Sequence, residues 1–142
     1  MTSTPIDPTT SPYGALALRL ALGIMFVAHA LLKLFVFTIP GTVGFFESVG
    51  FPGWLAHVTI LAELGGGALL ILGIYARWVA LALVPVLLGA LSVHLGNGWV
   101  FSAEGGGWEY PAFLAVASVV QTLLGDGAYS LRPSPLRRLA TA

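Results

Sequence analysis

The sequence predicts an all-α fold, a four-transmembrane-helix bundle with a short interfacial helix between helices 1 and 2. Of its 142 residues, 57% are hydrophobic and 8% are charged, whereas about a quarter of the residues in a soluble globular domain are charged. Crossing the hydrocarbon of a bilayer takes roughly 20 mostly apolar residues. Four segments meet or approach that length, Tyr13–Phe37, Trp54–Tyr75, Trp78–Gly96 and Trp108 to about Leu124. We therefore expect a disordered tail over residues 1–12, a membrane domain over residues 13–131 and a cytoplasmic tail over residues 132–142.

The first span contains a basic residue close to its start. Arg19 lies about 9 Å into the helix, counted from Tyr13, so its guanidinium is expected to extend back to the cytoplasmic headgroups. Ala28-His29-Ala30 has the small-x-small pattern of a signal-peptide cleavage site. However, the apolar run continues beyond it to Phe37, which favours an uncleaved span.

The segment between the first two spans predicts a short amphipathic helix. Pro40-Gly41 breaks the first helix, and Thr42–Val49 then combines four apolar side chains with polar Glu47 and Ser48. Such a helix is expected to lie in the membrane interface. In the second span, Gly66 and Gly67 follow Glu63 by three and four residues, which predicts that a neighbouring helix approaches closely beside the carboxylate.

The third and fourth spans each carry one unusual feature. Pro85 interrupts the third span, and we expect it to remove a backbone hydrogen bond and to bend the helix. In the fourth span, Gln121 and Ser118 lie on one helical face, which indicates a polar contact between helices.

The basic residues indicate the orientation of the chain. If the amino terminus is cytoplasmic, that side of the membrane carries five arginines and the opposite side only Lys33; the arginines are Arg19, Arg77, Arg132, Arg137 and Arg138. Because basic residues favour the cytoplasmic side, this distribution predicts a multi-pass membrane protein with both termini in the cytoplasm.

Five ionisable residues within or beside the spans form the candidate site, namely His29, Lys33, Glu63, His94 and Glu109. Residue counts place both histidines about 24 Å from the cytoplasmic surface, Lys33 one turn above His29, and Glu63 near the midplane. An unpaired charge in hydrocarbon costs several kcal/mol. We therefore expect Lys33 to pair with Glu63 or Glu109, and the histidines to bond to the remaining carboxylate, in one cluster in the outer half of the bundle.

The chemistry open to this cluster is limited by composition. The sequence has no cysteine, which excludes thiolate nucleophiles and iron–sulfur clusters. No HxxxH or HExxH spacing supports a metal site, and no basic patch supports nucleic-acid binding. A quinone fits better, because apolar walls suit its ring and polar side chains suit its carbonyls. The same charges could instead fasten helices, Lys33 could extend to the outer surface, and His94 could be an ordinary interfacial histidine.

The chain resembles the DoxX family of small four-helix membrane proteins over roughly residues 16–131. Six ordered motifs carry the resemblance: Arg19-Leu20-Ala21-Leu22-Gly23 with His29 and Lys33, Phe45-Phe46-Glu47-Ser48-Val49-Gly50-Phe51-Pro52, Glu63-Leu64-Gly65-Gly66 to Leu72-Gly73 and Arg77, His94 with Asn97-Gly98, Trp108-Glu109-Tyr110-Pro111, and Gly125-Asp126-Gly127 with Tyr129-Ser130-Leu131. The chain departs from the family pattern at Ala30, Leu32 and Arg132, where Gly, Gln and Asp are common.

The resemblance implies a bacterial inner-membrane protein from a family that is linked, in some branches, to membrane oxidoreductase complexes and to quinone-coupled thiosulfate oxidation. The first hypothesis is thus a membrane subunit of a quinone-linked oxidoreductase system, with a membrane or soluble oxidoreductase as partner in addition to the lipid bilayer. The alternatives are a non-catalytic assembly or scaffold module, and a small transporter or proton conduit.

Overall fold

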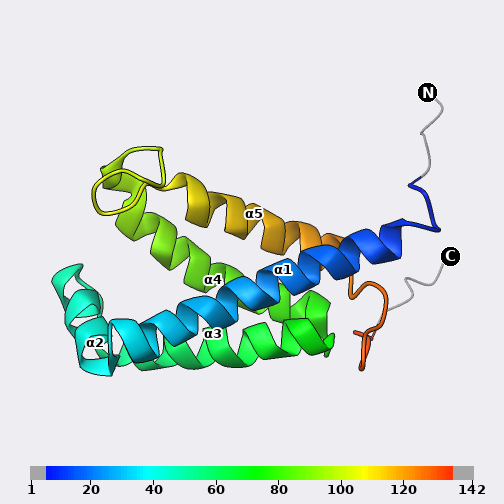
Figure 1. The fold of residues 1–142 in the computed structure, drawn as a ribbon, viewed down its shortest axis with the longest axis horizontal. Helices are drawn as coiled ribbons and strands as arrows, with labels where there is room; N and C mark the ends of the chain where they lie inside the picture. The colour runs from blue at the N-terminus through cyan, green and yellow to red at the C-terminus, as the bar shows by residue number, and fades with distance from the viewer. Residues whose placement is uncertain (1–5, 136–142) are drawn as a thin grey trace, which may run out of the picture.

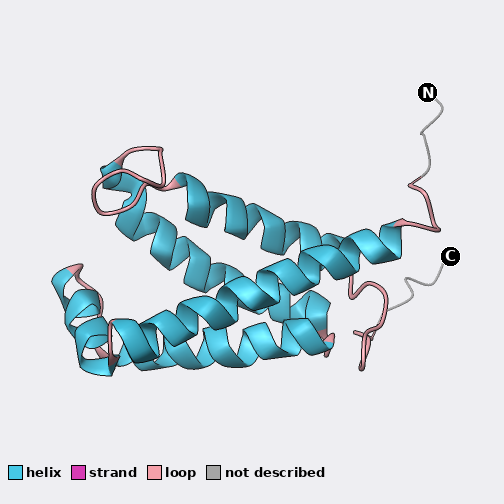
Figure 2. Cartoon of the chain, in the orientation of Figure 1, coloured by secondary structure: helices cyan, strands magenta, loops and turns pink. Residues whose placement is uncertain are grey.

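The computed structural model of the chain describes residues 6–135, and within them it contains helices and loops but no β-strand (Figures 1 and 2). The elements follow one another as α1 (Ser11–Leu31), the π-helical turn η1 (Leu32–Val36), α2 (Ile39–Ser48), α3 (Trp54–Leu72), α4 (Ala76–His94), the short 3-10 turn η2 (Leu95–Asn97) and α5 (Glu109–Leu124). The all-α prediction is confirmed.

In the described part of the chain, three helical segments are long and apolar enough to cross a membrane, and α5 is a shorter apolar helix. The three are Ser11–Val36, Trp54–Leu72 and Ala76–Asn97, each within a few residues of a predicted span. The short helix between the first two spans begins at Ile39 rather than at Thr42, because the Thr38 side chain accepts a hydrogen bond from Gly41 N and caps an earlier start.

The helices associate as two pairs, α1 along α3 and α4 along α5 (Figure 1). The predicted close approach beside Glu63 is confirmed. A methyl group added at Gly67 would lie 2.8 Å from the carbonyl oxygen of Gly23, so only glycine allows the two backbones to come this close. Gly66 faces α4 in the same way, and a methyl group there would meet Leu83.

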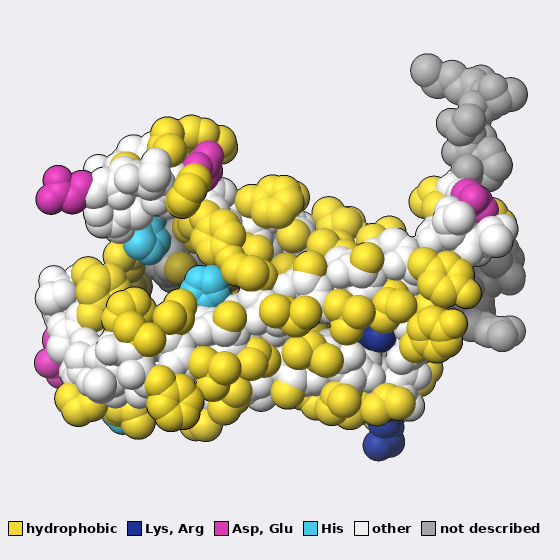
Figure 3. Space-filling view, viewed as in Figure 1, with side chains coloured by type: hydrophobic (Ala, Val, Ile, Leu, Met, Phe, Trp, Pro, Cys, Tyr) yellow, Lys and Arg dark blue, Asp and Glu magenta, His cyan; other side chains and the backbone are white. Residues whose placement is uncertain are grey.

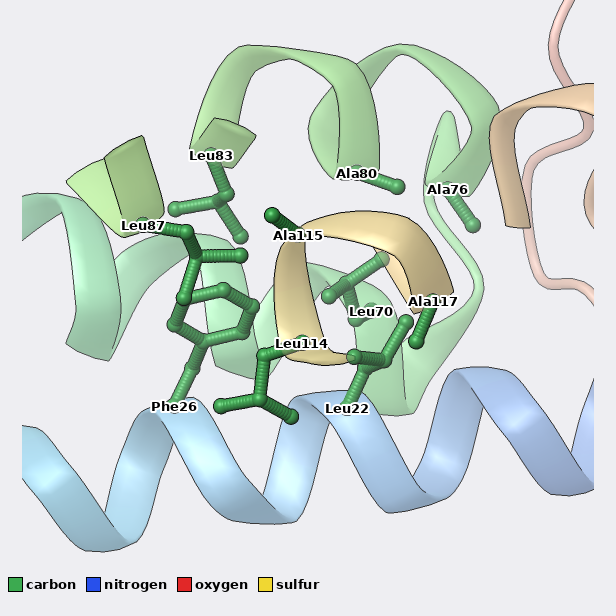
Figure 4. Packing of buried hydrophobic residues seen from close by; sticks show 10 residues of the cluster. All are labelled: Leu22, Phe26, Leu70, Ala76, Ala80, Leu83, Leu87, Leu114, Ala115 and Ala117. Carbon is green, nitrogen blue, oxygen red and sulfur yellow. The ribbon is translucent and has the colours of Figure 1, made fainter. Parts of the chain in front are cut away.

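An apolar core joins the two pairs near the middle of the bundle (Figure 4). It consists of Leu22, Phe26, Leu70, Ala76, Ala80, Leu83, Leu87, Leu114, Ala115 and Ala117. On the outer faces of the helices, large side chains such as Leu61 and Leu123 are more than two-thirds exposed. An apolar exterior of this kind suits contact with lipid.

Arg19 is buried, so the expectation that it reaches the headgroups is wrong. Its side chain is 1% exposed, and its guanidinium donates to the carbonyl oxygens of Asp126 and Ala128 and to the hydroxyl of Ser130, at 2.7–3.3 Å. The loop that follows α5 folds over the start of α1 and provides these acceptors. Burying a guanidinium costs little only when acceptors replace its water, and this loop supplies them.

The carboxylate of Asp126 fixes the same loop to the bundle. It accepts hydrogen bonds from the backbone N–H of Arg77, at the start of α4, and from the backbone N–H and hydroxyl of Ser134. Backbone hydrogen bonds between Arg132 and residues 73 and 75 hold the loop further. This loop therefore packs on the end of the bundle where both the first and last described residues lie (Figure 1). Residues 1–5 and 136–142, which include parts of both predicted tails, lie outside the described residues.

The predicted contact of Gln121 with another helix is wrong. Its amide nitrogen donates to the carbonyl oxygen of Gly125, one turn further along the same chain, and so closes the carboxyl end of α5. Ser118 Oγ and Gln121 Oε1 are buried and have no hydrogen-bond partner within residues 6–135.

Candidate functional site

Lys33 and Glu63 form an ion pair between α3 and the π-helical turn that extends α1. Lys33 Nζ lies 2.9 Å from Glu63 Oε1 and 2.8 Å from Oε2, so the ammonium is shared between both carboxylate oxygens. The Lys33 side chain is 18% exposed and that of Glu63 is 8% exposed. Of the two predicted partners of Lys33, the structure selects Glu63. The close packing of α1 on α3 at Gly23 and Gly67 brings the two helices near enough for this contact.

The π-helical turn η1 places Lys33 by a local change in the helix. A π-turn leaves main-chain carbonyls without their usual α-helical partners, and the Lys33 carbonyl accepts a hydrogen bond from the hydroxyl of buried Thr42 at 3.2 Å. The single hydrogen of this hydroxyl is shared with the Thr38 carbonyl oxygen at 2.9 Å, and at Thr38 the backbone reverses with φ +64°. Few non-glycine residues adopt such a φ, and the bonds that join Thr38 to Gly41 and Thr42 of α2 offset its cost here.

Both histidines bond to the backbone, so the expectation that they bond to a carboxylate is wrong. His29 Nδ1 lies 2.8 Å from the Met25 carbonyl oxygen, one turn earlier in α1, and its ring lies against that of Tyr110 with 5.9 Å between centroids. His94 Nδ1 lies 3.0 Å from the carbonyl oxygens of Gly105 and Gly106 in the loop before α5. These bonds fix the orientation of each ring.

Glu109 does not join the cluster. Its Oε1 accepts a hydrogen bond from the backbone N–H of Phe101 at 2.7 Å, and its own N–H donates to the Trp99 carbonyl. Since Glu109 is the first residue of α5, its carboxylate is close enough to bond to the preceding loop, and it fastens that loop to the helix. It lines a separate, more open hollow with Trp99 and Trp108.

The four remaining candidate residues line one cavity of about 470 Å³. All of the helices α1 to α5 contribute to its wall, and Figure 3 shows that face of the molecule hollowed, with histidine side chains at the hollow. Aromatic side chains from three helices and one loop surround it, namely Phe26, Phe45, Phe46, Phe51 and Tyr110. The site thus combines a largely apolar wall with His29, Lys33, Glu63 and His94. Within residues 6–135, no three His, Asp or Glu side chains gather as a metal site would require.

The apolar core closes the inner side of this cavity. Phe26, Leu87 and Leu114 belong both to the cavity wall and to the core, and the rest of the core continues from them toward the other end of the bundle (Figure 4). The cavity is therefore a pocket with an apolar floor.

Several cavity residues were not identified as candidates from the sequence. Tyr110 packs on His29, and Thr59 lies one turn before Glu63 on the same helical face. The helical spacing of Thr59 and Glu63 could have identified the threonine. Tyr110 stands in one of the six motifs that carry the family resemblance, but its place beside His29 depends on how α5 packs on α1, which the motif does not give.

Comparison with known proteins identifies the family. The family model described as DoxX matches residues 14–96, more than half of the chain. The chain belongs to the DoxX family. It is also 34% identical over 121 residues to a Bacillus subtilis protein named "Putative oxidoreductase CatD", and the match covers 84% of this chain and 85% of that protein. No solved structure gives a match.

Proposed function

We propose that this DoxX protein is a membrane subunit of a quinone-linked oxidoreductase system and that its cavity binds the quinone head group. The observation that carries the proposal is the cavity itself, an apolar and aromatic pocket of about 470 Å³ with a few polar groups in its wall. Small-molecule sites commonly have this composition and a volume of about 300–1,000 Å³. The name of the Bacillus subtilis relative supports an oxidoreductase system in general terms.

The polar groups suit the two oxygens of a quinone or quinol head. Lys33, His29 and His94 lie in the wall of one cavity with Glu63, and the aromatic side chains can pack on the ring. We propose that the head group enters from the lipid, because the molecule has an apolar exterior and the hollow opens on its surface (Figure 3).

The two alternative functions account for fewer of these features. A scaffold module would use the Lys33–Glu63 pair to fasten α1 to α3, and the pair does join them, but fastening does not require a cavity next to the pair. A proton or solute conduit would need a polar path across the bundle, whereas an apolar core lies on the inner side of the cavity.

We also propose that the protein lies in a bacterial inner membrane with both termini in the cytoplasm. Arg19 and Arg77 contact the loop after α5, and Arg132 lies in that loop, at the end of the bundle from which the termini extend. Lys33 lies toward the other end. This separation of basic residues favours a cytoplasmic location for the arginine-rich end.

Gly89 offers a direct test, because it lines the cavity and a side chain there would enter open space. We expect Gly89→Phe to reduce binding of a decyl-tailed quinone at least tenfold, measured by quenching of tryptophan fluorescence in detergent micelles. The matched control is Gly65→Phe, which changes another helical glycine with open space around it but outside the cavity wall. Equal binding by the two variants, or no binding by the unchanged protein, would refute the proposal.

A further inference from the structure

The hydrogen bonds of His29 and His94 determine which ring nitrogen carries the hydrogen. In each ring, Nδ1 lies within 3.0 Å of a backbone carbonyl oxygen. A carbonyl oxygen can only accept a hydrogen bond, so Nδ1 must be the donor. A neutral imidazole has only one N–H, and Nε2 of both rings is therefore left with a lone pair that can accept a hydrogen bond but not donate one.

These Nε2 atoms are open to a ligand. Neither has a hydrogen-bond partner within residues 6–135, and neither is among the fully buried polar atoms that lack one. Both rings line the cavity. The cavity therefore offers two hydrogen-bond acceptors that the protein leaves unused.

Lys33 is the main donor in the cavity wall, and most of its capacity is already used. Its ammonium carries three N–H bonds, of which two are directed to Glu63 Oε1 and Oε2. One N–H remains for a ligand. The hydroxyls of Thr59 and Tyr110 also line the cavity, but each can either donate or accept. The two Nε2 atoms can only accept, so their place in the wall favours a ligand able to donate.

We propose that the cavity binds the reduced, hydroquinone form of its ligand in preference to the quinone, with His29 and His94 as the residues that set this preference. This proposal rests on the proposed function. A quinone carbonyl can accept from Lys33 but leaves both Nε2 lone pairs without a partner. A hydroquinone hydroxyl can donate to Nε2, and its oxygen can still accept from Lys33.

Three ligands with the same ring distinguish the effect of hydrogen-bond donation on affinity from the effect of ligand shape. They are a decyl-tailed hydroquinone kept reduced under argon, the corresponding quinone, and the dimethyl ether of the hydroquinone, which has no O–H. We expect the hydroquinone to bind about fivefold to twenty-five-fold more tightly than either of the others, since one net hydrogen bond contributes about fivefold in affinity. Affinities are measured on the purified full chain by tryptophan quenching and by displacement.

The outcomes distinguish this proposal from the proposed function. If the quinone or the dimethyl ether binds as tightly as the hydroquinone, the preference does not exist, although the cavity remains a quinone-type site. If none of the three binds, the proposed function fails and this proposal fails with it. His29→Phe and His94→Phe should each lower the preference about fivefold, whereas His57→Phe, at an exposed position of α3 outside the cavity, should leave it unchanged.

The tautomer can also be measured without any ligand. In protein labelled with nitrogen-15 at its three histidines, the chemical shifts of the ring nitrogens show which nitrogen carries the hydrogen. The His57→Phe and His29→Phe variants together assign the signals to the three residues. We expect the Nδ1–H form for His29 and His94 at a pH at which the rings are neutral. The Nε2–H form at both positions would overturn the proposal.

Discussion

The Lys33–Glu63 pair predicts a large loss of stability when only the lysine is removed. Lys33→Met keeps the length of the side chain but leaves the Glu63 carboxylate, which is 8% exposed, without its counter-charge. Removing one partner of a buried pair typically costs about 3–5 kcal/mol. The carboxylate can avoid this cost by taking up a proton. For a glutamic acid of ordinary acidity, protonation costs about 3.7 kcal/mol at pH 7, so we expect a loss of about 3–4 kcal/mol.

The same reasoning gives a pH dependence whose sign can be tested. At pH 5 the cost of protonating an ordinary glutamic acid falls to about 1 kcal/mol, and the stability lost by Lys33→Met should shrink accordingly. The free energy of unfolding is measured by titrating sodium dodecyl sulfate into mixed micelles and following circular dichroism at both pH values. Glu104→Gln, at an exposed loop position, is the control for a surface carboxylate and should change stability little. A loss below about 1 kcal/mol at pH 7, or an equal loss at both pH values, would refute the reasoning.

Two further predictions concern the packing that positions the site. Gly67→Ala should destabilise the bundle by about 1–3 kcal/mol, because the methyl group would lie 2.8 Å from the Gly23 carbonyl oxygen. The control variant Gly65→Ala has open space around the added methyl group and should not destabilise the bundle. Equal stability of the two variants would contradict this packing. Arg19→Met should cost about 1–3 kcal/mol, since it leaves the buried carbonyl acceptors of the loop without their donor. It should also expose the loop around Asp126 to proteolysis; an unchanged cleavage rate would show that the loop is held by other contacts.

The features that follow from composition and helical spacing could be predicted from the sequence. The all-α class and the apolar spans follow from hydrophobic runs. The close approach beside Glu63 follows from glycines three and four residues further along one helix. An ion pair of Lys33 with a carboxylate follows from the cost of leaving a charge alone in hydrocarbon. Each of these inferences uses only local sequence or a strong energetic requirement.

The predictions that were wrong concern polar groups that have several possible hydrogen-bond partners. Arg19 was expected to reach water because it lies near the start of α1, but its guanidinium bonds instead to carbonyl oxygens of the loop after α5. Glu109 was placed in the cluster by its depth alone, whereas its rotation about α5 turns it to the loop backbone. Depth along a helix is fixed by counting residues, but direction around the helix and the course of a long loop are not.

The position of the Lys33–Glu63 pair beside the cavity helps to explain why the pair is charged. Replacing a buried ion pair by apolar side chains of similar size is often neutral or stabilising, so fastening α1 to α3 would not by itself favour a charged pair over an apolar one. A ligand-binding role does favour it, because the remaining N–H of Lys33 can reach a ligand in the cavity. The double variant Lys33→Met with Glu63→Leu separates the two roles. If the double variant is as stable as the unchanged protein and binds the hydroquinone at least tenfold more weakly, the pair serves the ligand. If it loses stability and keeps its affinity, the pair is a fastener and the ligand is held by other groups of the cavity wall.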